Sequence, residues 1–398
     1  MKKFIPLFLG MCFLGLASAC GPDAPSQKTG VLQFGQAMNH VGQMNLSEVA
    51  KSASYIPLET VEGSFVGQIR ELLYDGTHIY IVDNNQSGIK IFDKTGKFVR
   101  NINRIGNGPE EYLNGTLALS PANGNIFIFT RAKIMEYDIE GRFISAKEIP
   151  SVEGYMIART EAINEHLFIS SLMSMEAGKE YCAVVYDSQM NVQRLVAVPN
   201  NTIVESSPQN SSGITVVGIM PTRFFPAYEG ATRIFPPDAE HILSIKDEAS
   251  VDTAFVLDYG RYRLPVGTSI QRAGEGHYLS LMGFLETEKY VFLSTESRGV
   301  LGIESGQLKV LHDKTTGQAR TLYSAEETRH GFINDLHQGP DFWPWTRGVV
   351  GKKTIYTFFD AMALLEQAEN HKFATPLQKV VEGLEEDSNP VLMLVELK

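Results

Sequence analysis

Two parts of the chain repeat the same pattern of paired short strands at an interval of 45 residues. The first copy is residues 79–83 (IYIVD) with 89–93 (IKIFD), and the second is residues 126–129 (IFIF) with 134–138 (IMEYD). Short runs of β-branched and aromatic residues bounded by turn-forming residues are typical of strands. The repeat therefore predicts an all-β chain that is built from one recurring sheet unit.

The turn that follows each strand pair has a common Asp-x-x-Gly signature. It occurs at Asp93–Gly96 and again at Asp138–Gly141. Glycine at the fourth position supplies the positive φ that a tight hairpin turn requires. A third copy begins at Asp187, where Asn191, one place later than the glycine, also tolerates the left-handed conformation. These turns predict antiparallel hairpins inside each unit.

Weaker copies of the paired strands continue toward the C-terminus. They lie at residues 167–169 with 183–187, 242–245 with 253–258, 290–293 with 300–303 and 307–310, and 349–350 with 354–358. A period near 45 residues with paired strands is typical of a β-propeller blade. Counting the sets over residues 53–360 predicts a six-bladed β-propeller.

The two ends of the repeat region predict how the ring closes. Residues 54–59 form a strand pattern before the first blade, and residues 389–397 form another at the C-terminus. One or both would complete a blade shared between the chain ends, which removes an exposed sheet edge. Residues 360–369 and 376–386 have helical patterns, the second with proline at its first position. We therefore expect a short C-terminal helical pendant near residues 359–386 and a terminal closing strand.

The N-terminus has the three parts of a secretory signal. A basic start precedes an apolar run at residues 4–16, which is followed by small residues before Cys20. The run is shorter than the roughly 20 apolar residues that span a bilayer. The small residues resemble a bacterial lipobox, although Ala17 stands where such boxes usually carry leucine. We predict that residues 1–19 are removed and that Cys20 carries lipid; plain secretion after the same bond is the alternative.

The predicted domain organisation follows from these boundaries. Residues 1–19 are the signal peptide, residues 20–50 are the lipidated cysteine and a tether, and residues 51–398 are the propeller with its helices. The tether begins with a polar run that is too poor in apolar groups to fold. Several lipid chains on Cys20 would anchor the protein stably to a membrane of the cell envelope, with the outer membrane favoured. The periplasmic and surface faces both remain open.

Cysteine content and charge narrow the class of protein further. Cys12 leaves with the signal and Cys20 carries lipid, so Cys182 remains alone and is expected to be a buried core residue without a disulfide. The formal net charge of −11 becomes −13 when Lys2 and Lys3 are removed. An acidic surface of this kind excludes a nucleic-acid partner and a polybasic membrane-binding face.

Several segments together resemble a known family. They are residues 104–112 (RIGNGPEEY), 335–344 (DLHQGPDFWP), 56–59 (IPLE) and 389–393 (NPVLM). With the lipobox, they resemble the six-bladed β-propeller lipoproteins of Gram-negative gut-type bacteria, and more remotely the NHL-repeat propellers. The resemblance covers nearly all of the mature chain. It implies no catalytic residue, because the family has no established activity.

The first candidate binding segment is the loop after the first blade hairpin. Its residues 106–109 (GNGP) lack the third glycine of a dinucleotide fingerprint, and the proline removes a backbone N–H that an anion would need. We interpret them as a turn between blades. Arg104, Glu111 and Tyr112 are candidate ligand-binding residues at a channel mouth; a solvated face is the alternative.

The second candidate segment holds both tryptophans of the chain. Asp335, His337, Trp343 and Arg347 would form an aromatic and polar platform for a sugar or peptide. The alternative, which we favour, is a packing loop between blades, because aromatic residues usually fill cores first.

Two further places carry polar or aromatic side chains. His277 and Tyr278 follow a glycine-rich turn and are candidate ligand contacts, with an exposed turn as the favoured alternative. Residues 223–226 (RFFP) and 261–263 (RYR) combine cations with aromatics, which suits an acidic or peptide ligand. Solvated arginine head groups on a surface strand are the favoured alternative there.

No motif in the chain predicts catalysis or a cofactor. The nine histidines show no H-x-x-x-H or H-E-x-x-H spacing, and no G-x-S-x-G occurs. We therefore expect an envelope lipoprotein that acts as a binding or scaffold propeller for a peptide, glycan or protein partner, without a metal. The alternative is a metal-dependent propeller enzyme of the lactonase or lyase type, with its site in the central channel. The side chains that line the channel should decide between them.

Overall fold

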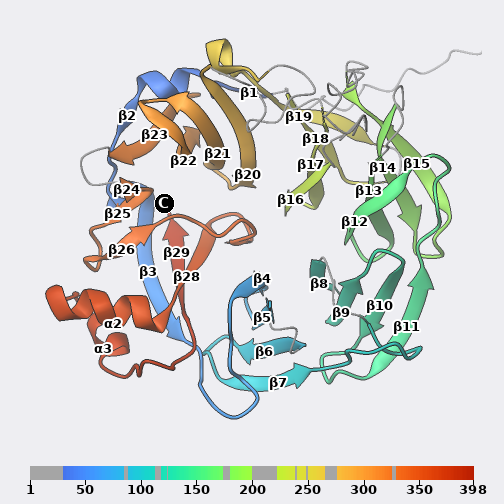
Figure 1. The fold of residues 1–398 in the computed structure, drawn as a ribbon, viewed down its shortest axis with the longest axis horizontal. Helices are drawn as coiled ribbons and strands as arrows, with labels where there is room; N and C mark the ends of the chain where they lie inside the picture. The colour runs from blue at the N-terminus through green and yellow to red at the C-terminus, as the bar shows by residue number, and fades with distance from the viewer. Residues whose placement is uncertain are drawn as a thin grey trace, which may run out of the picture.

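The computed structural model describes ten stretches of the chain, which together contain six blades around a common centre (Figure 1). These stretches are residues 30–84, 88–112, 118–122, 124–173, 180–199, 222–237, 240–247, 250–264, 276–324 and 329–398. Of residues 118–122 and 329 only the backbone is described. The predicted signal peptide (residues 1–19) and Cys20 lie outside the described residues.

Each of the first five blades is an antiparallel meander of four consecutive strands. Blade 1 contains β4 (Ile69–Tyr74), β5 (His78–Asp83), β6 (Ile89–Asp93) and β7 (Phe98–Ile102). Blade 2 contains β8 (Ala118–Ala122), β9 (Asn125–Phe129), β10 (Lys133–Tyr137) and β11 (Phe143–Glu148). Blade 3 contains β12 (Met156–Ala162), β13 (Leu167–Met173), β14 (Tyr181–Asp187) and β15 (Val192–Ala197). In these three blades the first strands β4, β8 and β12 lie nearest the centre (Figure 1).

Blades 4, 5 and 6 each also include one strand from the N-terminal part of the chain: β1, β2 and β3 respectively. Blade 4 contains β16 (Arg223–Tyr228), β17 (Ala231–Phe235), β18 (His241–Ile245) and β19 (Val251–Leu257). Blade 5 contains β20 (Tyr278–Glu286), β21 (Tyr290–Val300), β22 (Ile303–Asp313) and β23 (Ala319–Ser324). Blade 6 contains β27 (Val349–Val350), β28 (Thr354–Phe359), β29 (Val391–Leu397) and β3 (Ala50–Pro57). The predicted all-β, six-bladed propeller is confirmed.

Ring closure occurs in blade 6, where the two ends of the propeller meet. Strand β29 lies between β28 and β3 and pairs antiparallel with both. Its residues Val391, Met393 and Val395 are fully buried. The predicted closing strand is therefore present, and both terminal strands take part in it.

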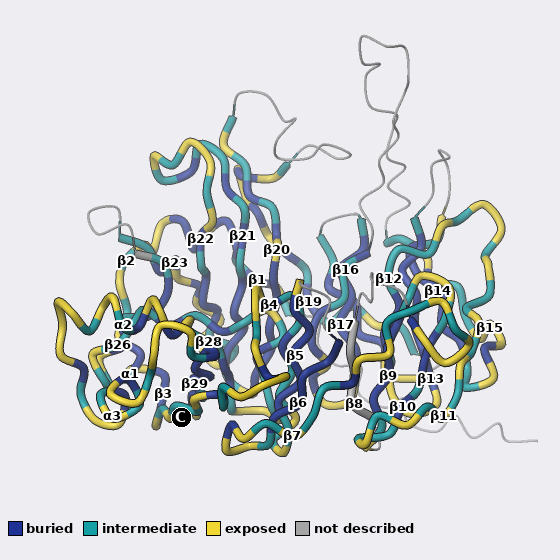
Figure 2. The backbone as a smooth tube through the Cα atoms, turned by 60° about the horizontal axis from the view of Figure 1, so that its bottom comes forward, coloured by how far each residue is buried: buried dark blue, intermediate teal, exposed yellow. Residues whose placement is uncertain are grey.

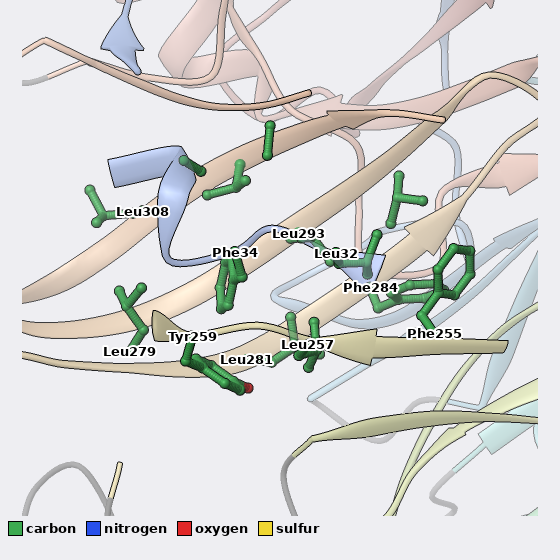
Figure 3. Packing of buried hydrophobic residues seen from close by; sticks show 14 of the residues in the cluster. Leu32, Phe34, Phe255, Leu257, Tyr259, Leu279, Leu281, Phe284, Leu293 and Leu308 are labelled. Carbon is green, nitrogen blue, oxygen red and sulfur yellow. The ribbon is translucent and has the colours of Figure 1, made fainter. Parts of the chain in front are cut away.

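Residues 30–49, which we call the N-terminal strap, belong to the propeller. Within the strap, β1 (Gly30–Leu32) pairs with β19 of blade 4 and β2 (Val41–Gly42) pairs with β23 of blade 5, both in parallel. Leu32 and Phe34 are fully buried in the cluster that joins blades 4 and 5 (Figure 3). The predicted tether boundary at residue 50 is therefore wrong for residues 30–49, because these residues pair with blade strands and most of their apolar side chains are buried.

The strap also contains the 3-10 helix η1 (Gln36–Asn39) and the one-turn helix α1 (Leu46–Val49). Near the C-terminus lie the hairpin of β25 (Phe332–Asn334) and β26 (Gly339–Phe342), and β24 (Arg329–His330), which pairs with β23. The 3-10 helix η3 (Gly260–Tyr262) follows blade 4.

The predicted helical pendant is confirmed as two helices beside blade 6 (Figure 1). Helix α2 (Ala361–Asn370) agrees with its prediction, whereas α3 (Leu377–Val381) is shorter than the predicted 376–386, because Gly383 disfavours a helix interior. Leu364 and Leu377 pack in one cluster with Val391 of the closing strand. Among the described helices, none is long and apolar enough to cross a membrane.

The Asp-x-x-Gly turns have the predicted conformation. Gly96 and Gly141 have φ angles of +88° and +78°. The Asp93 carboxylate accepts hydrogen bonds from the backbone N–H groups of Thr95 and Lys97, at 2.8 and 3.1 Å. In the third copy the expectation for Asn191 is wrong, as the next paragraph describes.

Met190, rather than Asn191, takes the left-handed conformation after β14, with φ +67°. Asn191 instead donates its side-chain amide to the Asp187 carboxylate at 2.9 Å. The turn therefore keeps the spacing of the other copies, and the aspartate hydrogen bonds stabilise a methionine at the position of the glycine.

Replacing Gly96 by alanine should destabilise the fold more than the same change at Gly124. Both residues have positive φ, +88° and +80°, so both variants carry backbone strain of about 1–3 kcal/mol. A Cβ atom on Gly96 would lie 2.2 Å from the Pro57 carbonyl oxygen, whereas one on Gly124 meets nothing within 4 Å. Urea unfolding of the two variants measures the difference. Equal losses would contradict a clash between this turn and β3.

Candidate functional site

A cavity of about 370 Å³ lies at the centre of the propeller. Its walls come from the innermost strands β4, β12, β16 and β20 and from the segment that precedes β27. The first strands of successive blades converge here (Figure 1), so residues far apart in the sequence become neighbours. Its charged lining residues are Arg70, Glu71, Arg159, Arg223 and Arg347.

Arg347 is held by a buried carboxylate from across the channel. Its Nη1 and Nη2 atoms donate to the two carboxylate oxygens of Glu161 at 2.5 and 2.9 Å. The Glu161 and Arg347 side chains are 4% and 18% exposed. The Tyr356 hydroxyl donates to the Arg347 carbonyl oxygen at 3.0 Å and fixes the backbone of this segment. A two-point contact of this kind orients a guanidinium rigidly.

Arg159 extends the ion pair into a chain that crosses the channel. Its Nε atom donates to Glu161 at 2.8 Å, and its Nη2 atom lies 3.6 Å from a carboxylate oxygen of Glu71. The resulting order is Arg347, Glu161, Arg159 and Glu71, with alternating charge. This chain links blade 6 to blade 3 and blade 3 to blade 1.

The two carboxylates of the chain respond differently to their surroundings. Burial alone would raise the pKa of Glu161, but the guanidiniums of Arg347 and Arg159 hold that pKa below its usual range. Burial raises the pKa of Glu71, against the opposing effect of Arg159 and Arg347. Burial also opposes the charge on Arg347, yet Glu161 raises the pKa of that guanidinium. Glu161 therefore stays ionised, and Glu71 takes up a proton more readily than an ordinary glutamate.

Arg70 and Arg223 are the cavity arginines that no described carboxylate neutralises at ion-pair distance. The Nε atom of Arg70 is buried without a hydrogen-bond partner within the described part of the chain. Arg223 donates through Nη1 to the carbonyl oxygen of Leu281 and lies 3.4 Å from the sulfur of Met282. Burial lowers the pKa of the Arg223 guanidinium. Both residues thus keep unused hydrogen-bond donors at the cavity.

The described side chains around the cavity therefore have an excess of positive charge. Four guanidiniums face two carboxylates, those of Glu71 and Glu161. This balance attracts anions and repels divalent cations. Among the described residues no group of three or more histidine, cysteine, aspartate or glutamate side chains is placed to hold a metal ion. Phe224, Phe225 and Met282 add an apolar wall beside the arginines.

Of the nine ligand-binding candidates from the sequence, Arg347 is the one that lines this cavity. Arg104, Glu111 and Tyr112 lie instead in the loop between blades 1 and 2. Tyr112 is buried, and its hydroxyl donates to the Ile102 carbonyl oxygen at 3.2 Å. The Glu111 carboxylate accepts from the backbone of its own loop at 2.9 Å.

Asp335, His337 and Trp343 all contact other residues of the protein. Asp335 accepts a hydrogen bond from the backbone N–H of Ser47 in the N-terminal strap at 2.9 Å. His337 packs edge-on against Tyr55, with ring centroids 5.5 Å apart. Trp343 packs against Phe292 and Phe332, with centroids 5.6 and 5.9 Å away respectively.

Tyr278 begins β20, the first strand of blade 5, and His277 directly precedes it. Strands β20, β21 and β22 extend beyond the other blades (Figure 2), and Tyr278 pairs with Arg298 near the far end of this extension. His277 contacts the carbonyl oxygen of Gly299 through Nδ1. These two candidates are therefore on a different part of the surface from the channel arginines.

Sequence reasoning missed Arg70, Glu71, Arg159 and Glu161 and noted Arg223 only as a cation beside aromatics. The sequence feature that could have indicated these residues is a charged side chain inside the first strand of a blade, where apolar residues would be expected. Arg70 and Glu71 lie in β4, whereas Arg159 and Glu161 lie in β12, two blades further along the chain, so no local motif brings the two pairs together.

Comparisons with solved structures agree with the fold. An exported protein of Bacteroides fragilis is 17% identical over 90% of this chain and 99% of its own, with a TM-score of 0.65. A member of the DUF4221 family from Bacteroides vulgatus is 11% identical over 88% of this chain and 97% of its own, with a TM-score of 0.50.

A catalytically inactive virginiamycin B lyase from Staphylococcus aureus is more distant, at 9% identity and a TM-score of 0.40 over 86% of this chain and 99% of its own. No curated protein matches the sequence. One family model, described as a domain of unknown function (DUF4934), matches residues 29–396, which is nearly the whole chain. The protein therefore belongs to the DUF4934 family, and its structure is a six-bladed β-propeller.

Proposed function

We propose that this protein is a binding propeller of the cell envelope, whose central channel holds an acidic group of a peptide or glycan. The observation that carries the proposal is the pair Arg70 and Arg223, which face the cavity without a described carboxylate partner at ion-pair distance. A guanidinium binds a carboxylate through two parallel, charge-assisted hydrogen bonds.

The cavity suits such a ligand in size and polarity. Its volume of about 370 Å³ falls within the range of small-molecule sites, roughly 300–1,000 Å³. The Arg347–Glu161–Arg159 chain holds the walls in place, so the site is preorganised before the ligand arrives. The apolar wall of Phe224 and Met282 would cover the uncharged part of the ligand.

Replacing both Arg70 and Arg223 by methionine should remove acidic-ligand binding. Isothermal titration with a tripeptide acid, its C-terminal amide, trigalacturonate and maltotriose separates charge from ligand class. We expect the peptide acid or trigalacturonate to bind and the neutral analogues not to bind. Hydrogen bonds to charged groups contribute about 1.5–3 kcal/mol each, so each lost arginine should weaken binding roughly 10- to 150-fold.

Arg142→Met is the matched control, because Arg142 is 74% exposed on the outer part of blade 2 and does not line the cavity. This variant should bind like the wild type. Equal binding of acidic and neutral ligands, or unchanged binding by the double variant, would contradict the proposal.

We also propose that the mature chain begins at a lipidated Cys20. The apolar signal and the lipobox-like residues before Cys20 support this. In cells fed an alkyne-tagged palmitate, the wild-type protein should be labelled and sediment with membranes. Cys20→Ser should lose the label and become soluble, while Cys182→Ala, which alters a buried core residue, should keep the label. Membrane-bound, labelled Cys20→Ser protein would refute the anchor.

A further inference from the structure

One polar row crosses blade 5 from β20 to β22. Gly283 on β20 pairs with Ser294 on β21, and Ser294 pairs with Lys309 on β22. Directly paired residues of neighbouring strands lie on the same face of a sheet. This face is turned toward blade 6, because Ser294 accepts a hydrogen bond from Trp343 and Gly283 lies near Thr346. The row therefore leads outward from the central cavity, which Gly283 lines.

Lys309 is a partly buried lysine that has a hydroxyl rather than a carboxylate as its partner. Its Nζ atom lies 3.3 Å from Ser294 Oγ, and the described residues offer it no carboxylate at ion-pair distance. Burial lowers the pKa of this amine, although the Trp343 ring 5.8 Å away favours the charged form. His330 is the titratable neighbour that senses the charge of Lys309. A lysine in such surroundings can serve as a base.

Ser294 Oγ accepts hydrogen bonds from Lys309 Nζ and from Trp343, and loss of a proton from the amine would let the hydroxyl donate to it instead. The indole of Trp343 donates from Nε1 to Ser294 Oγ at 3.0 Å. An indole N–H can only donate, so it occupies a lone pair of the hydroxyl oxygen. The hydroxyl hydrogen is then free to point at Lys309 Nζ when the amine is neutral. A nucleophile within hydrogen-bond reach of a base is the arrangement used in covalent catalysis, and here Trp343 orients the nucleophile.

Gly283 leaves Ser294 uncovered on the channel side. A Cβ atom at this position would lie 3.3 Å from Ser294 Cβ and 3.5 Å from its Oγ. Any larger side chain would therefore stand between the hydroxyl and the cavity. The absence of a side chain at position 283 leaves the space between Ser294 and the cavity free of a side chain from β20.

We propose that Ser294 is a nucleophile activated by Lys309, and that it accepts an acyl group from an ester that enters through the central channel. Ser294 Oγ forms a bond to the acyl carbon, its proton passes to Lys309 Nζ, and the ester's alkoxide leaves with that proton. Water then attacks the acyl-serine, Lys309 takes a proton from the water, and the carboxylic acid and the serine hydroxyl are released. The proposed reaction is an activity beyond ligand binding, and its nucleophile lies next to the binding cavity.

The test uses the full chain in detergent and an uncharged alkyl fluorophosphonate with a biotin tag. Attack by Ser294 forms an oxygen–phosphorus bond and expels fluoride, and peptide mass spectrometry locates the adduct. We expect the label on Ser294, none on Ser294→Ala, and labelling of Lys309→Met slowed by about 100-fold, as for loss of a general base. Ser305→Ala, which alters an exposed serine on β22, should be labelled like the wild type.

Gly283→Val provides a second variant that leaves both reacting groups in place. It should block labelling while circular dichroism and the unfolding midpoint show a folded protein. The absence of an adduct on Ser294 in the folded wild type, or equal labelling of Lys309→Met, would overturn the proposal. Because the probe carries no carboxylate, either result is independent of whether Arg70 and Arg223 bind an anion.

Discussion

Removing residues 391–398 should abolish the fold rather than merely lower its stability. The deletion takes away β29, whose backbone pairs with β28 on one side and β3 on the other. Val391, Met393 and Val395 are fully buried. Truncation of one such side chain typically costs about 2–5 kcal/mol, whereas a whole domain is stable by about 5–15 kcal/mol. The sum of these losses, together with two broken ladders, exceeds the stability available.

Far-UV circular dichroism, gel filtration and urea titration measure this effect. The truncated chain should elute as an expanded or aggregated species and should show no cooperative unfolding transition. Deleting Lys398 alone is the matched control, because this residue is exposed and lies after the end of β29. A truncated protein that still unfolds cooperatively would show that the ring does not need β29 to close.

Replacing Glu161 by glutamine should be the most damaging single substitution in the channel. It leaves the buried guanidinium of Arg347 without its two-point carboxylate partner and removes one of the two carboxylate partners of Arg159, the other being Glu71. Breaking one side of a buried ion pair costs about 3–5 kcal/mol, since the remaining charge stays desolvated. Urea unfolding at neutral pH measures the loss. Glu288→Gln, in an exposed pair with Lys353, should change stability little.

The pH dependence gives a second readout of the same residue. The pKa of Glu161 is lower in the folded protein than in the unfolded chain, where glutamate titrates near about 4.3. The carboxylate therefore stabilises the fold above that value, and this contribution disappears as the pH falls through the folded pKa. The difference between wild type and Glu161→Gln should be largest near neutral pH and should shrink below about pH 4. A difference that does not change with pH would show that the ionised carboxylate is not the cause.

The double change Glu161→Gln with Arg347→Met should recover part of the lost stability. Removing both charges of a buried pair avoids the desolvated, unpaired ion that a single change leaves behind. No recovery in the double variant would assign the loss to packing instead.

The strand repeat and the closing strand could be predicted because both are encoded locally. Runs such as residues 79–83 and 126–129 are continuous stretches of β-branched and aromatic residues, and the Asp-x-x-Gly turns mark their ends. The N-terminal strap could not be predicted in the same way. Its strands have two or three residues each, and they form by pairing with β19 and β23, which lie more than two hundred residues away.

The channel site could not be predicted because it depends on register and on ring geometry. Whether Arg159 or its neighbour faces the centre depends on the irregularity between residues 157 and 159 in the pairing of β12 with β13. Glu161 and Arg347 are 186 positions apart in the chain and meet only once the ring has closed. The loop of Arg104 and the segment of Trp343 were candidate binding sites because their polar and aromatic residues are contiguous in the sequence. In the structure most of these residues contact other parts of the protein instead.

Blade 6, which contains strands from both ends of the propeller, also determines when the ring can close during synthesis. Strand β3 is made early, whereas its partner β29 is made last, about 330 residues later, which at roughly 5–20 residues per second takes about 17–66 s. During that time the ladder edge of β3 has no partner from the closing strand. The ring therefore reaches its finished form only when β29 has been made and can pair with β3 and β28.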